Sequence, residues 1–593
     1  MKKIYVSILA AALATLPAWA QDNLQKEITL PKDFVPVVKK PVKKSSLPRV
    51  LKPVKSNEGA EISFTDWAEP TAVSVEIPTM LPYGYRTAHR FSNQRGYFDA
   101  GAGTQLNFVG SAGYRIVDAP TLKVDAWAQH NSTWNGKNTS PALEKVKQQF
   151  CDNALGVDVA KAFDKGTLNV AGKVHFDKFN YYAQPTIDGV DQSRLWWHDK
   201  QNFFEAYVKG AWTGSVDVSR YHDISYKVGV NYNYAGYKNG FAPLNFFVYD
   251  DFDGAKEHHL QAMLGAKYAI EASSSVGADF KFDLLSRTHK ELVDFDIAEK
   301  VKQNSSMFTI SPFYTYNGQN LMARLGVNVN LSFSDGTKFR LAPNVQLTYE
   351  FTPGVAFFAN AEGGKQLNTL SRLAAINRYL DPNGRYGNTF VPLDAEAGLK
   401  VGPFTGLTVK LFGGYGITKD ALMYTPSMLI ATGQLLNLDC KGLKAGAAVN
   451  YQYRQVAELD ARFTFAPQSD DFETGKSYSG YMLGLDHAKM VANADLKVHP
   501  IKALTVGVGM EYRNGRRYLS PTANSVIDGA PEYEYLFVDM NDVLNLHAGA
   551  SYRFDKYLII WVKAANLLNK QWDVLAGMGA QKLNVMGGIG FVF

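Results

Sequence analysis

From Gly96 to the last residue, apolar and polar side chains alternate in short runs. Leu504 to Tyr512 is one such run, with an apolar residue at every second position and Thr505, Gly507, Gly509 and Glu511 between them. A period of two is the period of a β-strand whose two faces meet different surroundings. We count about twenty-two such segments, with predicted starts at residues 96, 109, 120, 150, 166, 199, 223, 256, 273, 307, 321, 339, 355, 393, 406, 438, 455, 489, 504, 541, 557 and 583.

The residues on each side of these strands favour a membrane barrel over a water-soluble sandwich, although alternation by itself fits both. The polar side carries Lys173, His175, Lys227, Asn328 and Arg553, whereas the apolar side ends in tyrosines and phenylalanines. A polar interior with an apolar exterior rimmed by aromatic residues is typical of membrane barrels. We therefore predict an all-β fold, a transmembrane antiparallel up-and-down β-barrel of about 22 strands over residues 96–593.

Loop lengths predict which rim faces which side of the membrane. Connections after even-numbered strands are short, as at residues 164–166 and 271–272, and those after odd-numbered strands are mostly long, as at 184–198, 240–255, 290–306, 371–392 and 520–540. Outer-membrane barrels have short periplasmic turns and long external loops. This parity places both ends of the barrel at the periplasmic rim.

The last eleven residues, Leu583 to Phe593, form a strand that must pair at its free edge. Ile589, Phe591 and Phe593 lie on its apolar side. The stretch resembles the carboxy-terminal signal of bacterial outer-membrane barrels, and we take these three residues as the barrel-closure signal. The resemblance implies a multi-pass protein of the bacterial outer membrane that contacts outer-membrane lipid and the barrel-assembly machinery.

The first 95 residues divide into three parts. Residues 1–20 have Lys2 and Lys3, an apolar run and Ala18-Trp19-Ala20, as in a secretory signal peptide. Residues 21–58 form a Lys/Pro-rich tail that we expect to be an extended periplasmic spacer. Residues 59–95 are irregular, and we expect them in the barrel lumen. No run outside the signal peptide approaches the length of a membrane-spanning helix.

The tail accounts for the basic character of the chain. It carries about nine Lys and Arg against about four Asp and Glu, while the chain as a whole has a net charge of +6. No aromatic-rich basic patch follows it, so we expect no nucleic-acid partner. A disordered linker is one interpretation. The other is a docking arm in which Glu27, Ile28, Thr29 and Leu30 add a strand to a periplasmic or outer-membrane protein.

The barrel resembles that of TonB-dependent receptors in strand number, in long external loops, in the run Ala564 to Lys570 before the final strand, and in the closing residues Gly590 to Phe593. The resemblance implies active uptake of a bulky nutrient through a barrel gated by a plug. About 75 residues between Gln21 and Gly96 are too few for such a plug, so we predict that it is absent. Residues 59–95, infolded loops or a partner subunit would then fill the lumen.

Candidate chemistry is sparse. Asp250, Asp251 and Asp253 cluster in an external loop and form a weak candidate calcium site, because clustered carboxylates suit a hard cation. The full ligand spacing of a calcium loop is lacking, so an ordinary Asp-Gly turn is the preferred interpretation. The two cysteines are far apart, and we expect both to be unpaired. We expect no cofactor and no enzymatic activity. Two function classes remain open: passage of a nutrient, and a non-transporting subunit of an outer-membrane complex.

Overall fold

The structure is a computed structural model that describes residues 94–593 except 138–146, 183–199, 220–221, 241–252, 295–296, 335–337, 382, 384–385, 427–432, 470–477 and 528–529. All the described residues belong to one compact unit, residues 69–593. The signal peptide, the tail and all but the last two residues of the predicted lumen segment 59–95 lie outside the described residues.

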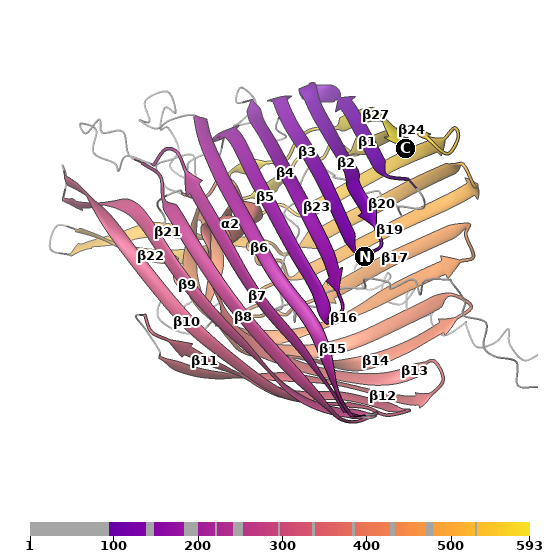
Figure 1. Ribbon diagram of the computed structural model, residues 1–593. Helices are drawn as coiled ribbons and strands as arrows, with labels where there is room; N and C mark the ends of the chain where they lie inside the picture. Colours follow the sequence, from indigo (N-terminus) through magenta and orange to yellow (C-terminus); the bar gives the residue numbers. More distant parts are fainter. Residues whose placement is uncertain are drawn as a thin grey trace, which may run out of the picture. The chain divides into compact units, whose positions relative to one another are not determined.

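One closed sheet makes the wall of the barrel (Figure 1). The sheet holds 23 strands, and one of them, the two-residue β18 (Tyr478–Ser479), only lies beside β16, so 22 strands form the wall. These are β1 (Gly96–Gly103), β2 (Asn107–Ala119), β3 (Leu122–Gly136), β4 (Gln148–Phe163), β5 (Gly166–Asn180), β6 (Lys200–Ser219), β7 (His222–Tyr237), β8 (Lys256–Glu271), β9 (Ser274–Asp294), β10 (Ile297–Asn317), β11 (Leu321–Ser332), β12 (Phe339–Thr352), β13 (Val355–Gln366), β14 (Thr389–Phe404), β15 (Leu407–Pro426), β16 (Gly433–Tyr453), β17 (Ala457–Phe465), β19 (Met490–Ile501), β20 (Leu504–Asn514), β23 (Val543–Arg553), β24 (Leu558–Ala565) and β27 (Asn584–Val592).

The predicted fold class and strand number are confirmed. Each strand pairs antiparallel with the next wall strand, and the tight connections follow even-numbered wall strands, for example residues 164–165 between β4 and β5. The predicted loop 290–306 is wrong. Its residues continue the β9–β10 ladder, in which Lys300 faces Lys290, so β10 begins ten residues before its predicted start. Polar residues occupy both sides of this extension, which removes the apolar alternation.

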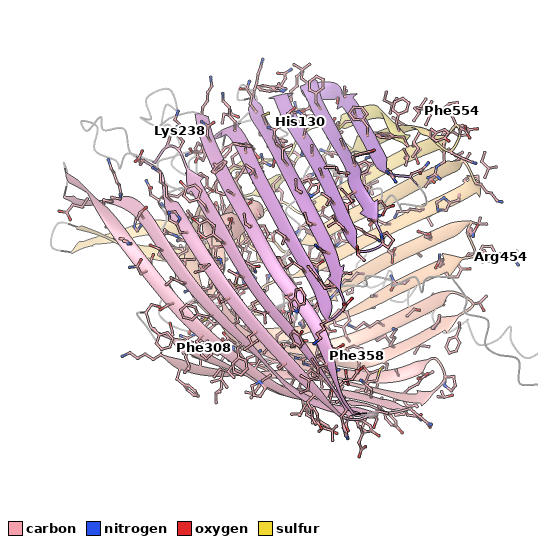
Figure 2. The ribbon with its side chains drawn as sticks, in the orientation of Figure 1. His130, Lys238, Phe308, Phe358, Arg454 and Phe554 are labelled. Atoms are coloured by element: carbon pink, nitrogen blue, oxygen red, sulfur yellow. The ribbon has the colours of Figure 1, made fainter. Side chains whose placement is uncertain are left out.

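The two sides of the wall differ as predicted. In β7, Val228, Val230 and Tyr232 point outward and are 45%, 50% and 41% exposed, while Gly229 is buried on the inward side. Side chains project from both faces of the wall in Figure 2, where Phe308, Phe358 and Phe554 mark three places around it. A hydrocarbon environment stabilises this outer face, and the polar inner face is suited to water.

A seam joins the first and last wall strands. Phe593 and Gly96 exchange backbone hydrogen bonds of 2.9 and 2.8 Å, and β1 pairs with β27 from Tyr97 to Gly103. On the inner side, the indole of Trp561 (6% exposed) crosses the neighbouring glycines Gly588 and Gly101, and its Nε1 donates to Asp99 at 2.8 Å. The ring thus covers three adjacent strands.

The remaining elements lie in the connections. They are the 3₁₀ turn η1 (Thr104–Leu106), the helix α2 (Leu370–Ile376), the hairpin β21 (Arg517–Ile527) with β22 (Ala530–Asp539), and the hairpin β25 (Asp573–Leu575) with β26 (Met578–Gly579). Within the described ranges, no helix has the length and hydrophobicity to cross a bilayer. Cys151 and Cys440 are both free.

Candidate functional site: the infolded loops and the lumen

Parts of several long connections meet inside the wall at its long-loop end and form a buried apolar cluster, which we call the loop core. It joins the long-loop ends of wall strands to the connections 367–388 and 566–583. Its buried members are Phe150, Phe179, Tyr181, Tyr182, Phe203, Ala235, Tyr237, Ala255, Leu370, Leu373, Tyr379, Leu380, Tyr386, Leu422, Tyr424, Leu435, Leu575, Ala576 and Met578. Because these side chains come from opposite parts of the wall, the loops fill part of the lumen there.

Arg378 is a polar anchor of the loop core. It follows α2 on the β13–β14 connection, yet its guanidinium reaches Asp177 at 2.7 Å and Asp152 at 3.3 Å on β5 and β4. Its charge also lies 4.5 Å from the ring centroid of Phe150. Burial alone would lower the pKa of Arg378, but the two carboxylates raise it above its ordinary value. The connection is therefore fixed to wall strands that are some 200 residues earlier in the chain.

The start of α2 is held by a buried ion pair. Arg287 and Glu257, from β9 and β8, meet at 2.7 Å and are 3% and 1% exposed. Glu257 Oε1 accepts the backbone N–H of Leu370 at 2.9 Å, and Arg287 donates to the carbonyl of Asn368 at 2.7 Å. A carboxylate beside the first free N–H groups of a helix is favourable. Thr369 caps the same end by accepting from Arg372 N.

A second anchor lies on the connection between β17 and β19. Asp486 forms ion pairs with Arg513 and Arg516, and Arg516 also donates to the carbonyl of Val574 at 2.7 Å. Burial acts to raise the pKa of Asp486, but the two guanidinium groups hold it below its ordinary value. The next residue, His487, is fully buried, and burial lowers its pKa to about 4. This anchor ties three connections together.

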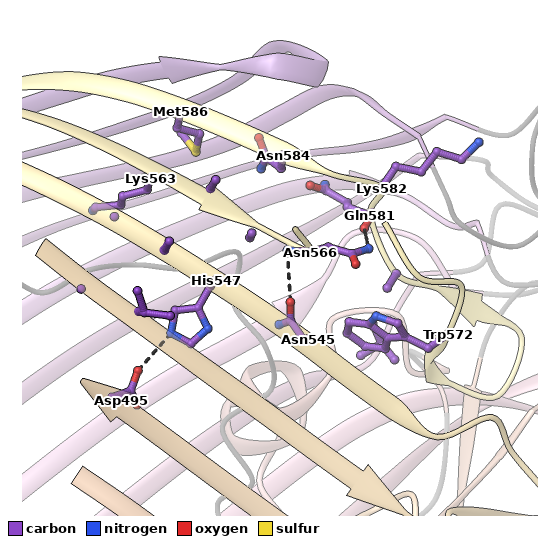
Figure 3. A pocket seen from close by; sticks show the side chains of 18 of the residues that line it. Asp495, Asn545, His547, Lys563, Asn566, Trp572, Gln581, Lys582, Asn584 and Met586 are labelled. Atoms are coloured by element: carbon purple, nitrogen blue, oxygen red, sulfur yellow. Dashed lines mark hydrogen bonds and ion pairs between the residues drawn. The ribbon is translucent and has the colours of Figure 1, made fainter. Parts of the chain in front are cut away.

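A pocket of about 180 Å³ lies between these loops and the wall (Figure 3). Its wall side comes from β19, β20, β23, β24 and β27, and its loop side includes Trp572 and Gln581. His547 and Asp495 interact at 3.0 Å on the wall side, and Asn545 accepts the backbone N–H of Asn566 at 3.1 Å. The lining mixes apolar groups with polar and charged ones, among them Asp495, Lys497 and Lys563, so the space suits a small amphipathic ligand or water.

The run Ala564 to Lys570 has a defined structural role beside this pocket. Asn566 and Asn569 adopt positive φ values of 50° and 47°, a conformation that asparagine tolerates. The Asn566 side chain accepts from Lys570 N at 3.1 Å and donates to the carbonyl of Gln581 at 2.9 Å. The two asparagines therefore shape the turn that carries the chain from β24 into the lumen.

The structure separates the predicted site residues. Ile589, Phe591 and Phe593 lie on the outward side at the β27 end of the seam, 43%, 39% and 55% exposed. Asp253 is also exposed and pairs with Lys256 at 3.3 Å. Asp250 and Asp251 of the calcium candidate, and Glu27 to Leu30 of the docking candidate, lie outside the described residues. No group of three metal-ligating side chains occurs in the described part. Both candidates stay predictions.

Sequence reasoning missed the anchors Arg378, Asp486 and Glu257. One local signal was available: Thr369 followed by Leu370, Leu373 and Ala374 is a short amphipathic helix with an N-cap. No local sequence pattern indicated the partners of the anchors, because Arg378 and its partner Asp152 are 226 residues apart in the chain.

Several solved structures share this fold. The ferric enterobactin receptor PfeA of Pseudomonas aeruginosa matches with a TM-score of 0.60 at 11% identity, over 84% of this chain and 80% of that one. The siderophore receptor PirA of Acinetobacter baumannii gives 0.59 at 10% identity, over 84% and 80%. The ferric-catecholate import receptor Fiu of Escherichia coli K12 gives 0.57 at 12% identity, over 85% and 82%.

The comparisons by sequence find nothing: no protein-family profile matches the chain, and no curated protein matches it. Likeness at this level of identity establishes architecture. The described chain has the 22-stranded barrel fold of the TonB-dependent receptors.

Proposed function

We propose that this protein is an outer-membrane receptor through which a nutrient passes, and that the infolded loops form its outer gate. The observation that carries this proposal is the loop core, which joins connections from opposite sides of the lumen at one end of a barrel with a polar inner wall. PfeA, PirA and Fiu are siderophore or ferric-catecholate receptors, which supports uptake of a scarce solute. Neither the resemblance to these receptors nor the set of residues that line the pocket indicates an enzyme.

The roles of the amino-terminal segments follow from the proposed location of the barrel in the outer membrane. Residues 59–95 would enter the lumen from the periplasmic side and close it below the loop core. The Lys/Pro-rich tail 21–58 would remain in the periplasm after removal of residues 1–20, and Glu27 to Leu30 would offer a short strand to a partner. Outer-membrane lipid and the barrel-assembly machinery are the partners expected of any barrel with this closing strand.

A second function is favoured by one specific observation. Arg378, Glu257 and Asp486 are buried ion-paired anchors, and breaking a buried pair costs about 3–5 kcal/mol. Loops fixed so firmly also suit a sealed, non-transporting subunit of an outer-membrane complex. The two functions differ in whether the lumen can open.

Single-channel conductance in planar bilayers separates them. We expect the full-length protein to be closed for most of the time, and a variant in which a Gly/Ser linker replaces residues 368–387 to conduct steadily. Arg378→Gln should give frequent openings, because it leaves Asp152 and Asp177 without their guanidinium partner. Arg454→Gln, at an exposed arginine on a short turn (Figure 2), is the matched control.

Removal of residues 21–95 tests the second seal. If the linker variant conducts only when this segment is also deleted, both ends of the lumen are closed in the native protein. Silence of the doubly altered barrel, with folding shown by its heat-dependent migration in detergent gels, would refute passage through the lumen and leave the complex subunit.

A further inference from the structure

The outer face of β3 and β4 carries a serine, a histidine and an asparagine in one group. His130 and Ser132 share the outward side of β3 with Trp134, whose ring is exposed. Asn153 is the direct cross-strand partner of His130 on β4 and shares the outward side of that strand with the exposed Leu155. His130, which Figure 2 labels, therefore lies between the other two side chains.

These three side chains form a continuous series of hydrogen bonds. Asn153 Oδ1 lies 2.7 Å from His130 Nδ1, and His130 Nε2 lies 3.0 Å from the hydroxyl oxygen of Ser132. An amide oxygen can only accept, so Nδ1 carries the ring proton and Nε2 accepts from the hydroxyl. A hydroxyl that donates to an imidazole, itself oriented by a third group, has the arrangement of a nucleophile with its general base.

A fourth side chain fixes the direction of the Asn153 amide. Its Nδ2 donates to Cys151 Sγ at 3.4 Å, two residues earlier on β4. With the amide nitrogen held on that side, the amide oxygen faces the imidazole and keeps His130 in the tautomer that can take a proton from Ser132. Asn153 is therefore a positioning residue, and Cys151 supports its orientation.

The group lies where the outer face changes from apolar to polar. Toward the short turns, the outward positions next to it are apolar on both strands: Ala128 and Ala126 on β3, and Leu155 and Val157 on β4. The ester groups of membrane lipids lie at the same kind of boundary, between the hydrocarbon core and the headgroups. An acyl ester at this height comes within reach of Ser132.

Small residues leave room for an acyl chain beside the group. Ala128 pairs with Ala112, and Gly110 is the cross-strand partner of His130 on β2. A Cβ added to Gly110 would meet no atom nearer than 3.8 Å. Leu155, which is exposed, borders this strip on β4. The strip suits a linear acyl chain whose carboxyl end lies at the hydroxyl.

Ser132 itself is fully buried among its neighbours on this face. Phe108 and Cys151 are its cross-strand partners on β2 and β4, and Trp134 follows it on β3. The rings of Phe108 and Trp134 are exposed, and an ester reaches the hydroxyl when one of them rotates. The same rings keep bulk water from the nucleophile.

A cation on the next strand can stabilise the negative oxygen that forms during ester cleavage. Lys178 on β5 is the cross-strand partner of Cys151, so it lies two strands from Ser132. At about 4.8 Å per strand, the two Cα atoms are roughly 10 Å apart, most of which a lysine side chain can span. An ammonium group at this position favours the charged tetrahedral intermediate.

From this geometry we propose that Ser132, His130 and Asn153 form an esterase site on the outside of the barrel wall, which cleaves the carboxylic ester of a membrane lipid. The Ser132 oxygen bonds to the ester carbonyl carbon while its proton passes to His130 Nε2. The bond from that carbon to the alcohol oxygen then breaks, and His130 gives the proton to the leaving alcohol. Water, deprotonated by His130, hydrolyses the acyl-serine and releases a carboxylic acid.

This activity goes beyond passage of a nutrient and does not depend on whether the lumen opens. It also departs from the expectation of no enzymatic activity, which rested on the sequence. His130 and Ser132 are close in the chain, but Asn153 joins them only through the pairing of β3 with β4.

A fluorophosphonate with a long alkyl chain tests the nucleophile directly. The Ser132 oxygen would displace fluoride from phosphorus, and peptide mass spectrometry of the full-length protein in neutral detergent locates the adduct. We expect Ser132 to be labelled, and His130→Gln to slow labelling roughly 100-fold or more. Ser286, whose hydroxyl donates to Asn304 in place of a histidine, is the internal control and should stay unlabelled.

Fatty-acid release from mixed micelles measures the reaction itself. Phosphatidylethanolamine and lipopolysaccharide are tested separately, because both carry acyl esters, and the comparison identifies the lipid. Ser132→Ala should lower release roughly 1,000-fold or more, and Ser286→Ala should match the native protein. Asn153→Ala should lower kcat with KM unchanged, and Asn153→Asp should restore it, since a carboxylate accepts the same Nδ1 proton.

Heat-dependent gel migration shows that each variant is folded. Labelling of Ser132, together with release from either lipid that depends on Ser132, supports the proposal. Adducts on other residues only, release that survives Ser132→Ala, or no release from both lipids by the native protein overturns it. Conductance through the lumen is measured separately, so failure of the esterase site leaves the proposed passage of a nutrient unaffected.

Discussion

Single residues explain how so wide a wall stays tightly joined. Large rings on its inner face lie across glycines of neighbouring strands, as Trp127 does over Gly156 and Trp561 over Gly588. A ring that covers a glycine restores the contacts that the missing side chain would have made. The N–H group of the ring also has a hydrogen-bond partner, because Trp127 Nε1 donates to Asp158 at 2.9 Å.

Two adjacent glycines of β27 provide a matched test of this packing. A Cβ at Gly588 would overlap the indole of Trp561, whereas a Cβ at Gly587, on the outward side, would come no nearer than 3.7 Å to the carbonyl of Trp561. We expect Gly588→Ala to destabilise the barrel by about 1–3 kcal/mol, through overpacking. Urea titration followed by gel migration measures the change.

Gly587→Ala is the control for that substitution. It should leave the urea midpoint within experimental error of the native protein. Equal midpoints for the two alanine variants would contradict the role of the indole at the seam.

His487 predicts a pH dependence of loop opening. The centroid of its ring lies 4.7 Å from that of Tyr478, its Nδ1 accepts from Gln468 Nε2 at 3.0 Å, and the charges of Asp486 and Arg517 act on it. Its pKa is about 4 when buried, below the ordinary 6.5. The opened loop therefore takes up a proton at a higher pH than the closed loop does. The free energy of opening has its full value above pH 6.5 and falls by up to about 3 kcal/mol as the pH is lowered toward 4.

Protection factors from hydrogen exchange of residues 478–488 measure this opening. They should decrease as the pH falls from 7 to 4.5, and His487→Gln should remove the decrease. Unchanged protection in the native protein across this range would show that His487 is accessible to protons in the closed form.

At the scale of elements, the helix α2 connects the loop core to its anchors. Leu370 and Leu373 are each 2% exposed and pack into the loop core, whereas Ala375 faces outward from it. We expect Leu373→Ala to cost about 2–5 kcal/mol of local stability by leaving a cavity. Hydrogen exchange of residues 368–380 reports the effect, and Ala375→Ser should leave exchange unchanged.

The wall strands could be predicted from sequence because each one crosses the same two environments, which imposes a period of two. The β9–β10 extension, in which Lys290 pairs with Lys300, could not, since polar residues occur on both of its faces. The loop core could not be predicted either. Arg378 and Asp152 meet only because the barrel closes, and no local sequence pattern indicates a contact between residues so far apart in the chain.

At the scale of the whole molecule, the pairing of β1 with β27 that closes the barrel can be tested with a disulfide. Ala100 and Ile589 are direct cross-strand partners on the outward side of the seam. With Cys151 and Cys440 changed to Ser, the pair Ala100→Cys and Ile589→Cys should form a disulfide, because facing residues of paired strands lie within bonding range. The bridge converts the chain to a loop of altered gel mobility.

The pair Ala102→Cys and Ile589→Cys is offset by two residues along β1 and serves as the control. It should form little disulfide under the same oxidation. Efficient bonding of the offset pair would mean that the register of β1 with β27 is different.

The seam also sets an order of events in time. Trp561 and Asp99 are separated by 462 positions in the chain, so the edge of β1 cannot acquire its partner until nearly every other strand has been delivered. Contacts so distant in sequence form slowly. Throughout that interval β1 presents unpaired backbone groups that invite association with other chains. A cell that makes this protein must therefore shield the first strand until the last one arrives.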